Sequence, residues 1–248
     1  MKTRKRICIF GESPLVEEYA SLCLNKGLDA QVRFNPGSPK GNLTKSAKQI
    51  SKPGKIFQIG LELTNISLLE KKKNLIELDR ALSPKSIILS SSITVSVEEQ
   101  ATWIKQPARL AGLGALPSLI ENDLVELAPS GSTNATTIAA SREFIGMLGK
   151  ESSIVQDSVG MVLPRILCML MNEACFAIME GVAIGREIDT AMKLGTNYPQ
   201  GPVEWGKRIG WGQVHAVMEA LYRNFGDDRY RVAPLLRKAA FNGVLAAS

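Results

Sequence analysis

Few side chains in this sequence could carry acid–base or nucleophilic chemistry. His215 is the only histidine, and it lies in an apolar, helix-like run, 211–225, where a packed or surface role is the simpler interpretation. The four cysteines show no C-x-x-C spacing; they are Cys8, Cys23, Cys168 and Cys175. We interpret them as reduced, buried thiols of a cytoplasmic protein, and we predict no metal site.

The start of the chain has the element order of a nucleotide-binding βαβ unit. A β-branched and aromatic run at 6–10 leads into Gly11, and a helix is expected over 14–25. In such a unit the backbone N–H groups at the helix start bind a diphosphate. Gly11, Ser13 and Leu15 are therefore candidate cofactor-binding residues.

The dinucleotide fingerprint itself is incomplete. The pattern G-x-G-x-x-G reads GESPLV here, so only Gly11 remains, and Glu12 adds a negative charge beside the expected phosphates. The acidic residue that binds the ribose is replaced by Asn35, whose amide can still hydrogen-bond a hydroxyl. Arg33 fits a 2′-phosphate, so NAD is the expected cofactor and NADP stays open.

Hydrophobic periodicity predicts two domains. Strands are predicted over 6–10, 29–34, 55–61, 86–90, 109–114 and 124–128. Helices between and after them are predicted over 14–25, 66–82, 96–105 and 134–148. Helices alone follow, over 162–180, 185–194, 202–209, 212–224 and 234–242. The pattern indicates a Rossmann-like α/β domain (1–155) with a doubly wound, mainly parallel sheet, and an all-α domain (156–248).

Composition and charge indicate which classes of binding partner to expect. The net charge of +6 belongs to residues 1–150, which hold 20 basic and 14 acidic residues, and five lysines lie in a polar stretch, 36–55, that we interpret as a solvated loop. This stretch has no interleaved aromatics, so we expect no nucleic-acid binding. The apolar run 159–184 carries four polar or charged residues, so we expect no membrane span.

The second half resembles the C-terminal domain of the 3-hydroxyacyl-CoA dehydrogenase family. The motifs that carry the resemblance are NEA at 172–174, EGVA at 180–183, IDTAMKLG at 188–195, YPQGP at 198–202 and GDDRYR at 226–231. The first half is similar to the family's Rossmann domain in element order, with ELD at 77–79 and SSS at 90–92 as its best pieces. The resemblance implies NAD-linked oxidation or reduction of a 3-hydroxyacyl-CoA.

The resemblance also assigns positions to the family's catalytic residues, and most are substituted. The histidine that accepts the hydroxyl proton corresponds to Gly114, the serine to Ile93 and the asparagine to Pro164. Only the glutamate that holds the histidine remains, as Glu126, with Thr94 as the nearest substitute hydroxyl.

On the cofactor side, a glutamate–lysine pair of the family corresponds to Ile66 and Lys71, and Ser90 opens the serine run. The cofactor-binding set implied is therefore Gly11, Ser13, Leu15, Asn35, Lys71 and Ser90.

Three hypotheses follow for function. The first is a family member with impaired or altered catalysis; the second is a working dehydrogenase that uses Glu126 or water as the base. The third is a non-catalytic interaction protein, or an acyl-CoA- or nucleotide-binding module, that keeps the fold. In each, we expect a homodimer formed through the helical domain, because the nearly all-apolar helix 162–180 needs cover.

Overall fold

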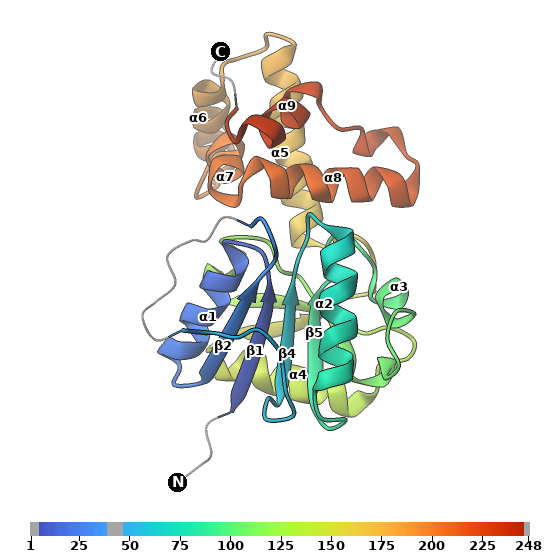
Figure 1. The fold of residues 1–248 in the computed structure, drawn as a ribbon. Helices are drawn as coiled ribbons and strands as arrows, with labels where there is room; N and C mark the ends of the chain where they lie inside the picture. The colour runs from blue at the N-terminus through green and yellow to red at the C-terminus, as the bar shows by residue number, and fades with distance from the viewer. Residues whose placement is uncertain (1–4, 39–46, 246–248) are drawn as a thin grey trace. The chain divides into compact units, whose positions relative to one another are not determined.

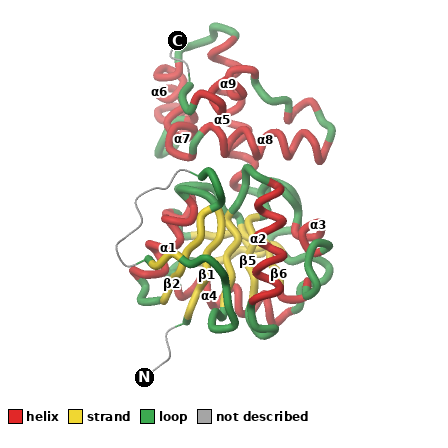
Figure 2. The backbone as a smooth tube through the Cα atoms, in the orientation of Figure 1, coloured by secondary structure: helices red, strands yellow, loops and turns green. Residues whose placement is uncertain are grey.

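The computed structural model describes residues 5–38 and 47–245 (Figure 1). It contains two compact units, residues 1–161 and residues 162–248. The first is α/β, whereas the second consists of helices joined by loops in its described part (Figure 2). The fold class predicted from the sequence is confirmed.

A single sheet of eight strands, counted over the described residues, forms the centre of the first unit. The strands are β1 (Arg6–Gly11), β2 (Asp29–Phe34), β3 (Lys48–Gln49), β4 (Ile59–Leu63), β5 (Ile87–Ser91), β6 (Leu110–Leu113), β7 (Leu124–Ala128) and β8 (Glu151–Ile154). Their order is β3-β2-β1-β4-β5-β6-β7-β8, and every pair is parallel except β6 with β7. The chain reverses direction across the sheet between β1 and β4, which makes that place the topological switch point.

Helices cover both faces of the sheet. They are α1 (Leu15–Asn25), α2 (Leu68–Ala81), α3 (Val97–Ala101) and α4 (Ala135–Met147), with short 3₁₀ turns η1 (Pro107–Arg109) and η2 (Leu119–Glu121). Ser67, Ser96 and Asn134 precede α2, α3 and α4, and each side chain accepts a hydrogen bond from the backbone N–H three residues on. These caps fix where the helices begin.

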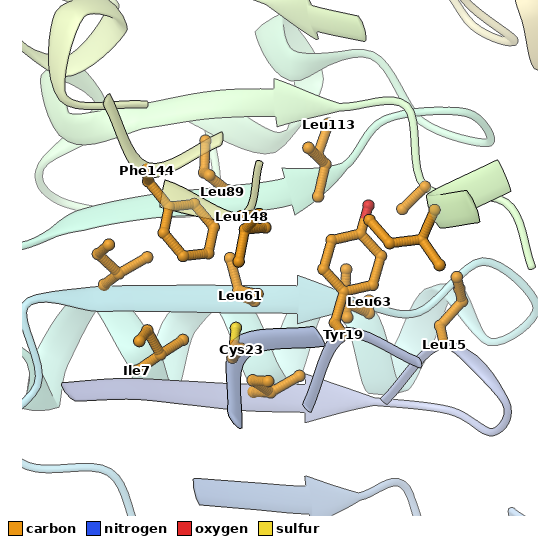
Figure 3. Packing of buried hydrophobic residues seen from close by; sticks show 14 of the residues in the cluster. Ile7, Leu15, Tyr19, Cys23, Leu61, Leu63, Leu89, Leu113, Phe144 and Leu148 are labelled. Atoms are coloured by element: carbon orange, nitrogen blue, oxygen red, sulfur yellow. The ribbon is translucent and has the colours of Figure 1, made fainter. Parts of the chain in front are cut away.

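The core lies mainly between the sheet and α1 with α4 (Figure 3). Tyr19 and Cys23 of α1 and Phe144 of α4 pack onto strand residues of one sheet face, among them Leu61 and Leu89. The opposite face packs against α2 and the residue that follows it, because a Cβ added at Gly60 would lie 3.4 Å from the Leu78 side chain and 2.8 Å from that of Leu82. Alternate residues of each strand thus point to different helices.

Three local predictions for the α/β unit were wrong. The stretch 36–55 is not all loop, because β3 lies in it and pairs with β2, while 39–46 lie outside the described residues. The strand predicted over 55–61 begins only at Ile59, after a turn in which the Phe57 N–H donates to the Gly54 carbonyl. Strand β8 was missed because its sequence, ESSI, lacks apolar alternation.

The helical unit follows the predicted pattern closely. It contains α5 (Leu163–Met179), α6 (Gly185–Thr196), α7 (Pro202–Ile209), α8 (Trp211–Phe225), η3 (Asp228–Tyr230) and α9 (Pro234–Asn242). Asn172 ties α5 to the segment before α9, since its amide donates to the Arg231 carbonyl and accepts from the Ala233 N–H, both at 2.9 Å. Over the residues described, none of the helices is both long and apolar enough to span a membrane.

The cysteines give a first testable prediction. All four are buried and unpaired, and burial raises the pKa of Cys8, Cys23 and Cys175 to about 12. At pH 8 on the order of 10⁻⁴ of each such thiol is therefore ionised. We expect no thiol of the native protein to react with Ellman's reagent within minutes, and all four to react after unfolding in guanidinium. One rapidly reacting native thiol would contradict this burial.

Candidate active site

The carboxyl ends of β1 and β4 lie against each other at the switch point. A Cβ added at Gly11 would lie 2.5 Å from the carbonyl oxygen of Leu63, so only glycine fits there. The N–H of Glu12 donates to the same carbonyl at 3.3 Å. Gly11 is therefore needed for the approach of these two strand ends.

The side chain of Glu12 reaches from the end of β1 to the backbone that follows β4. Its Oε1 accepts hydrogen bonds from the N–H groups of Asn65 (3.0 Å) and Ile66 (3.2 Å), which follow β4 and precede α2. The residue is only 6% exposed. The Glu12 carboxylate thus accepts hydrogen bonds from backbone N–H groups beside the start of α2. The start of a helix is a place where anions are stabilised.

Three predicted cofactor-binding residues direct their side chains into the protein. Ser13 donates to the Glu17 carboxylate at 2.6 Å, and Leu15 is fully buried in the core. The Asn35 amide donates to the Thr64 hydroxyl at 2.9 Å and accepts from the Asn74 amide at 2.8 Å. These contacts join β2, β4 and α2.

Lys71 and Ser90 meet at a buried carboxylate. The Lys71 amine forms an ion pair with Glu62 of β4 and donates to the Thr64 carbonyl at 2.9 Å, while its side chain is 1% exposed. The hydroxyl of Ser90 donates to the same Glu62 carboxylate at 3.1 Å. Lys71 and Ser90 therefore hold α2 and β5 onto β4.

Arg33, the candidate for a 2′-phosphate, also has protein partners. Its guanidinium lies 3.7 Å from the centre of the Phe10 ring and donates to Glu77 at 2.8 Å and to Asn74 at 3.0 Å. The group is thus paired with an anion and stacked on a ring.

These contacts test whether the switch point fits a dinucleotide. The amides next to β4 already hold the Glu12 carboxylate, and the Asn35 amide is used by Thr64 and Asn74. A diphosphate at the β1 end would lie beside a buried negative charge. As folded here, these residues contact one another, and a dinucleotide at the switch point would have to compete with the Glu12 carboxylate.

At the carboxyl end of β6, positions 114 and 126 are in contact. The N–H of Gly114 donates to the Glu126 carbonyl at 2.9 Å, and a Cβ added at Gly114 would lie 3.1 Å from the Glu126 Cβ. The Met161 sulfur would lie 3.3 Å from the same added atom. A side chain at position 114 would therefore be held between Glu126 and Met161.

Of the remaining positions, 93 and 164 carry no hydroxyl or amide side chain. Ile93 is fully buried, and Thr94 beside it is 6% exposed. Pro164 lies in the first turn of α5 in the helical unit. His215 lies in α8, where its Nδ1 is 3.7 Å from the Glu219 carboxylate, consistent with a packed helix residue.

Two residues of this region were missed by sequence reasoning. The Asn65 amide donates to the Ala115 carbonyl at 2.9 Å and its oxygen accepts from the Ser91 hydroxyl, so it joins the ends of β4, β5 and β6. Its position directly after a strand was the available signal. Met161 has a φ of 48° and is buried, and nothing in the sequence indicated its contact with position 114.

Comparison with known proteins identifies the family. Residues 160–247 match the 3-hydroxyacyl-CoA dehydrogenase C-terminal domain, and residues 64–158 match the family's NAD-binding domain. The second match begins after β4, so the turn that contains Glu12 precedes it.

Individual relatives agree. The chain is 34% identical over 168 residues to a 3-hydroxybutyryl-CoA dehydrogenase of Bradyrhizobium diazoefficiens, and 36% identical over 169 residues to a probable one of Deinococcus radiodurans. These alignments cover 68% of this chain, and 57% and 61% of those relatives.

A solved structure, (S)-3-hydroxybutyryl-CoA dehydrogenase from Ralstonia eutropha, superposes with a TM-score of 0.79 at 29% identity. The superposition covers 97% of this chain and 95% of the Ralstonia chain. This superposition and the two domain matches lead to one assignment: this chain belongs to the 3-hydroxyacyl-CoA dehydrogenase family.

Proposed function

We propose that this protein is a 3-hydroxyacyl-CoA dehydrogenase-type protein in which NAD(P)-linked oxidation or reduction of a 3-hydroxyacyl-CoA is impaired. Family membership supports the substrate and cofactor class. The buried free thiols of this protein suit a reducing compartment, so we place the protein in the cytoplasm.

One observation carries the proposal. Glu126 is 8% exposed and lies against Gly114, the position that the resemblance gives to the proton-accepting histidine. Glu126 therefore has no imidazole at position 114 to orient. A positioned general base contributes roughly 10²–10⁴-fold to such reactions.

The first test is binding and turnover on the same preparation. We expect saturable quenching of NADH fluorescence below about millimolar ligand, strengthened by acetoacetyl-CoA, and a rise in melting temperature with both ligands. We expect turnover of acetoacetyl-CoA to be roughly 10²–10⁴-fold below that of the Ralstonia eutropha enzyme assayed alongside.

Two outcomes of this test would change the conclusion. Turnover equal to that of the Ralstonia enzyme would contradict impaired catalysis, and Glu126→Gln would then show whether Glu126 acts as the base. Absence of binding by both ligands would remove the cofactor and the substrate from the proposal.

A second candidate, a non-catalytic homodimer, is favoured by the surface of the helical unit. Val182, Leu194 and Phe241 are 71%, 82% and 83% exposed, so the helical unit presents large apolar side chains that a second copy could bury. Both candidate functions predict a homodimer, but the second predicts no binding of NADH or acyl-CoA.

The oligomeric state can be measured independently of activity. We expect multi-angle light scattering to give about twice the chain mass of 26.9 kDa at micromolar concentration. Leu194→Asp is expected to weaken the dimer, whereas Lys26→Asp in the α/β unit serves as the matched surface control. A monomer at all concentrations would contradict dimerisation.

A further inference from the structure

The most informative feature outside the catalytic positions is the buried carboxylate of Glu12 at the switch point. It follows β1 directly, and its Oε1 accepts from two successive backbone N–H groups that follow β4. The two strands are neighbours in the sheet, so this one side chain bridges the ends between which an open α/β sheet binds its ligand.

The amides that hold Glu12 are fixed in place. Asn65 is anchored by its side chain to Ala115 and Ser91. Ile66 immediately precedes Ser67, which caps α2. Two rigid N–H groups beside the positive end of a 14-residue helix form an environment that stabilises a negative charge.

The backbone of Glu12 is fixed as well. Its N–H donates to Leu63, and its carbonyl accepts from the N–H of Val16 in the first turn of α1. The carboxylate therefore cannot leave the amides by a shift of the main chain alone. A rotation of the Glu12 side chain is the smallest movement that vacates them.

We propose that Glu12 is a built-in anionic competitor that sets the affinity of this protein for dinucleotides. The inference rests on the proposed function, because it concerns the same cofactor. A diphosphate at the β1–α1 turn meets the carboxylate at close range in a poorly hydrated place, so binding requires Glu12 to be displaced or neutralised. Ligands without phosphate do not meet this barrier.

Charge and shape can be separated by substitution. Glu12→Gln keeps the acceptor oxygen for Asn65 and Ile66 and removes the charge. Glu18→Gln is the matched control, since Glu18 also lies at the start of α1 and accepts a backbone N–H, that of Ser118, at 3.0 Å. Circular dichroism and melting temperature establish that each variant is folded, and Glu12→Ser replaces Glu12→Gln if that variant is not.

The experiment compares NADH, ADP and adenosine on the full chain by fluorescence and calorimetric titration. We expect Glu12→Gln to bind NADH and ADP about tenfold more tightly than the unsubstituted protein, with adenosine unchanged. Glu18→Gln is expected to change none of the three by more than about twofold.

Four results would overturn the inference. Equal NADH affinity with and without the Glu12 charge would remove Glu12 as a competitor, while NADH binding itself would leave the proposed function intact. An equal gain for adenosine and ADP, or an equal gain in Glu18→Gln, would show that local charge at Glu12 is not the barrier. No binding by any variant would overturn both this inference and the cofactor part of the proposed function.

Discussion

Replacing Lys71 by methionine is expected to lower the free energy of unfolding of the α/β unit by about 3–5 kcal/mol, because it leaves a buried carboxylate without its partner. The Lys71 amine and the Glu62 carboxylate are 1% and 0% exposed, and Ser90 and Thr64 complete the group. Guanidinium unfolding followed by circular dichroism gives the change directly.

The chain offers a matched control for this substitution. Lys73 lies two residues further along α2, is exposed, and pairs with Glu70 at 2.7 Å on the surface. Lys73→Met is expected to cost less than about 1 kcal/mol. The double variant Glu62→Gln with Lys71→Met should regain most of the stability lost in Lys71→Met, since no unpaired charge remains.

This series also bears on the predicted cofactor role of Lys71. If Lys71→Met were as stable as Lys73→Met, the ion pair would not be structural and a role toward a ligand would regain support. A large loss that the double variant reverses would assign Lys71 to the packing of α2 on β4.

Restoring a histidine at position 114 should have the largest effect on activity. We expect Gly114→His combined with Met161→Gly to raise turnover of acetoacetyl-CoA with NADH on the order of 10²-fold, the lower range of general acid–base catalysis, because the imidazole can give the carbonyl oxygen its proton in this direction. A Cβ at position 114 would contact Glu126, which can accept a hydrogen bond from the imidazole and orient it.

The second substitution makes room for the first. The Met161 sulfur would lie 3.3 Å from the added Cβ, and Met161 itself has a φ of 48°, a conformation that glycine adopts without strain. Gly114→Phe with Met161→Gly fills the same space without a base and is expected to gain nothing. Adding Glu126→Gln to the histidine variant should remove most of the gain.

Unchanged turnover in the histidine variant, with NADH and acetoacetyl-CoA bound, would show that the missing base does not limit the reaction. The substitutions at Ile93 and Pro164 would then become the leading explanation, because the resemblance places substrate-positioning groups there.

The amino-acid sequence by itself determined the fold class and most helices of this protein. Amphipathic periodicity, caps such as Ser96 and punctuation by Gly and Pro are local signals, so α7 and α9 begin and end where they were predicted. The motifs at 188–202 were sufficient to indicate the family. Carrying the family's catalytic positions over to 93, 114 and 164 gave the prediction that these residues are substituted.

Only the tertiary structure decided what the remaining polar residues do. Glu12 and Ile66 are 54 residues apart in the sequence, which is too far for local periodicity to relate them. Parallel pairing of β1 with β4 nevertheless brings them into hydrogen-bond contact. Lys71 and Ser90 were predicted to face a cofactor, whereas the structure directs both to Glu62. Which partner a buried polar group finds depends on strand order and register, and neither is encoded in the spacing of residues along one element.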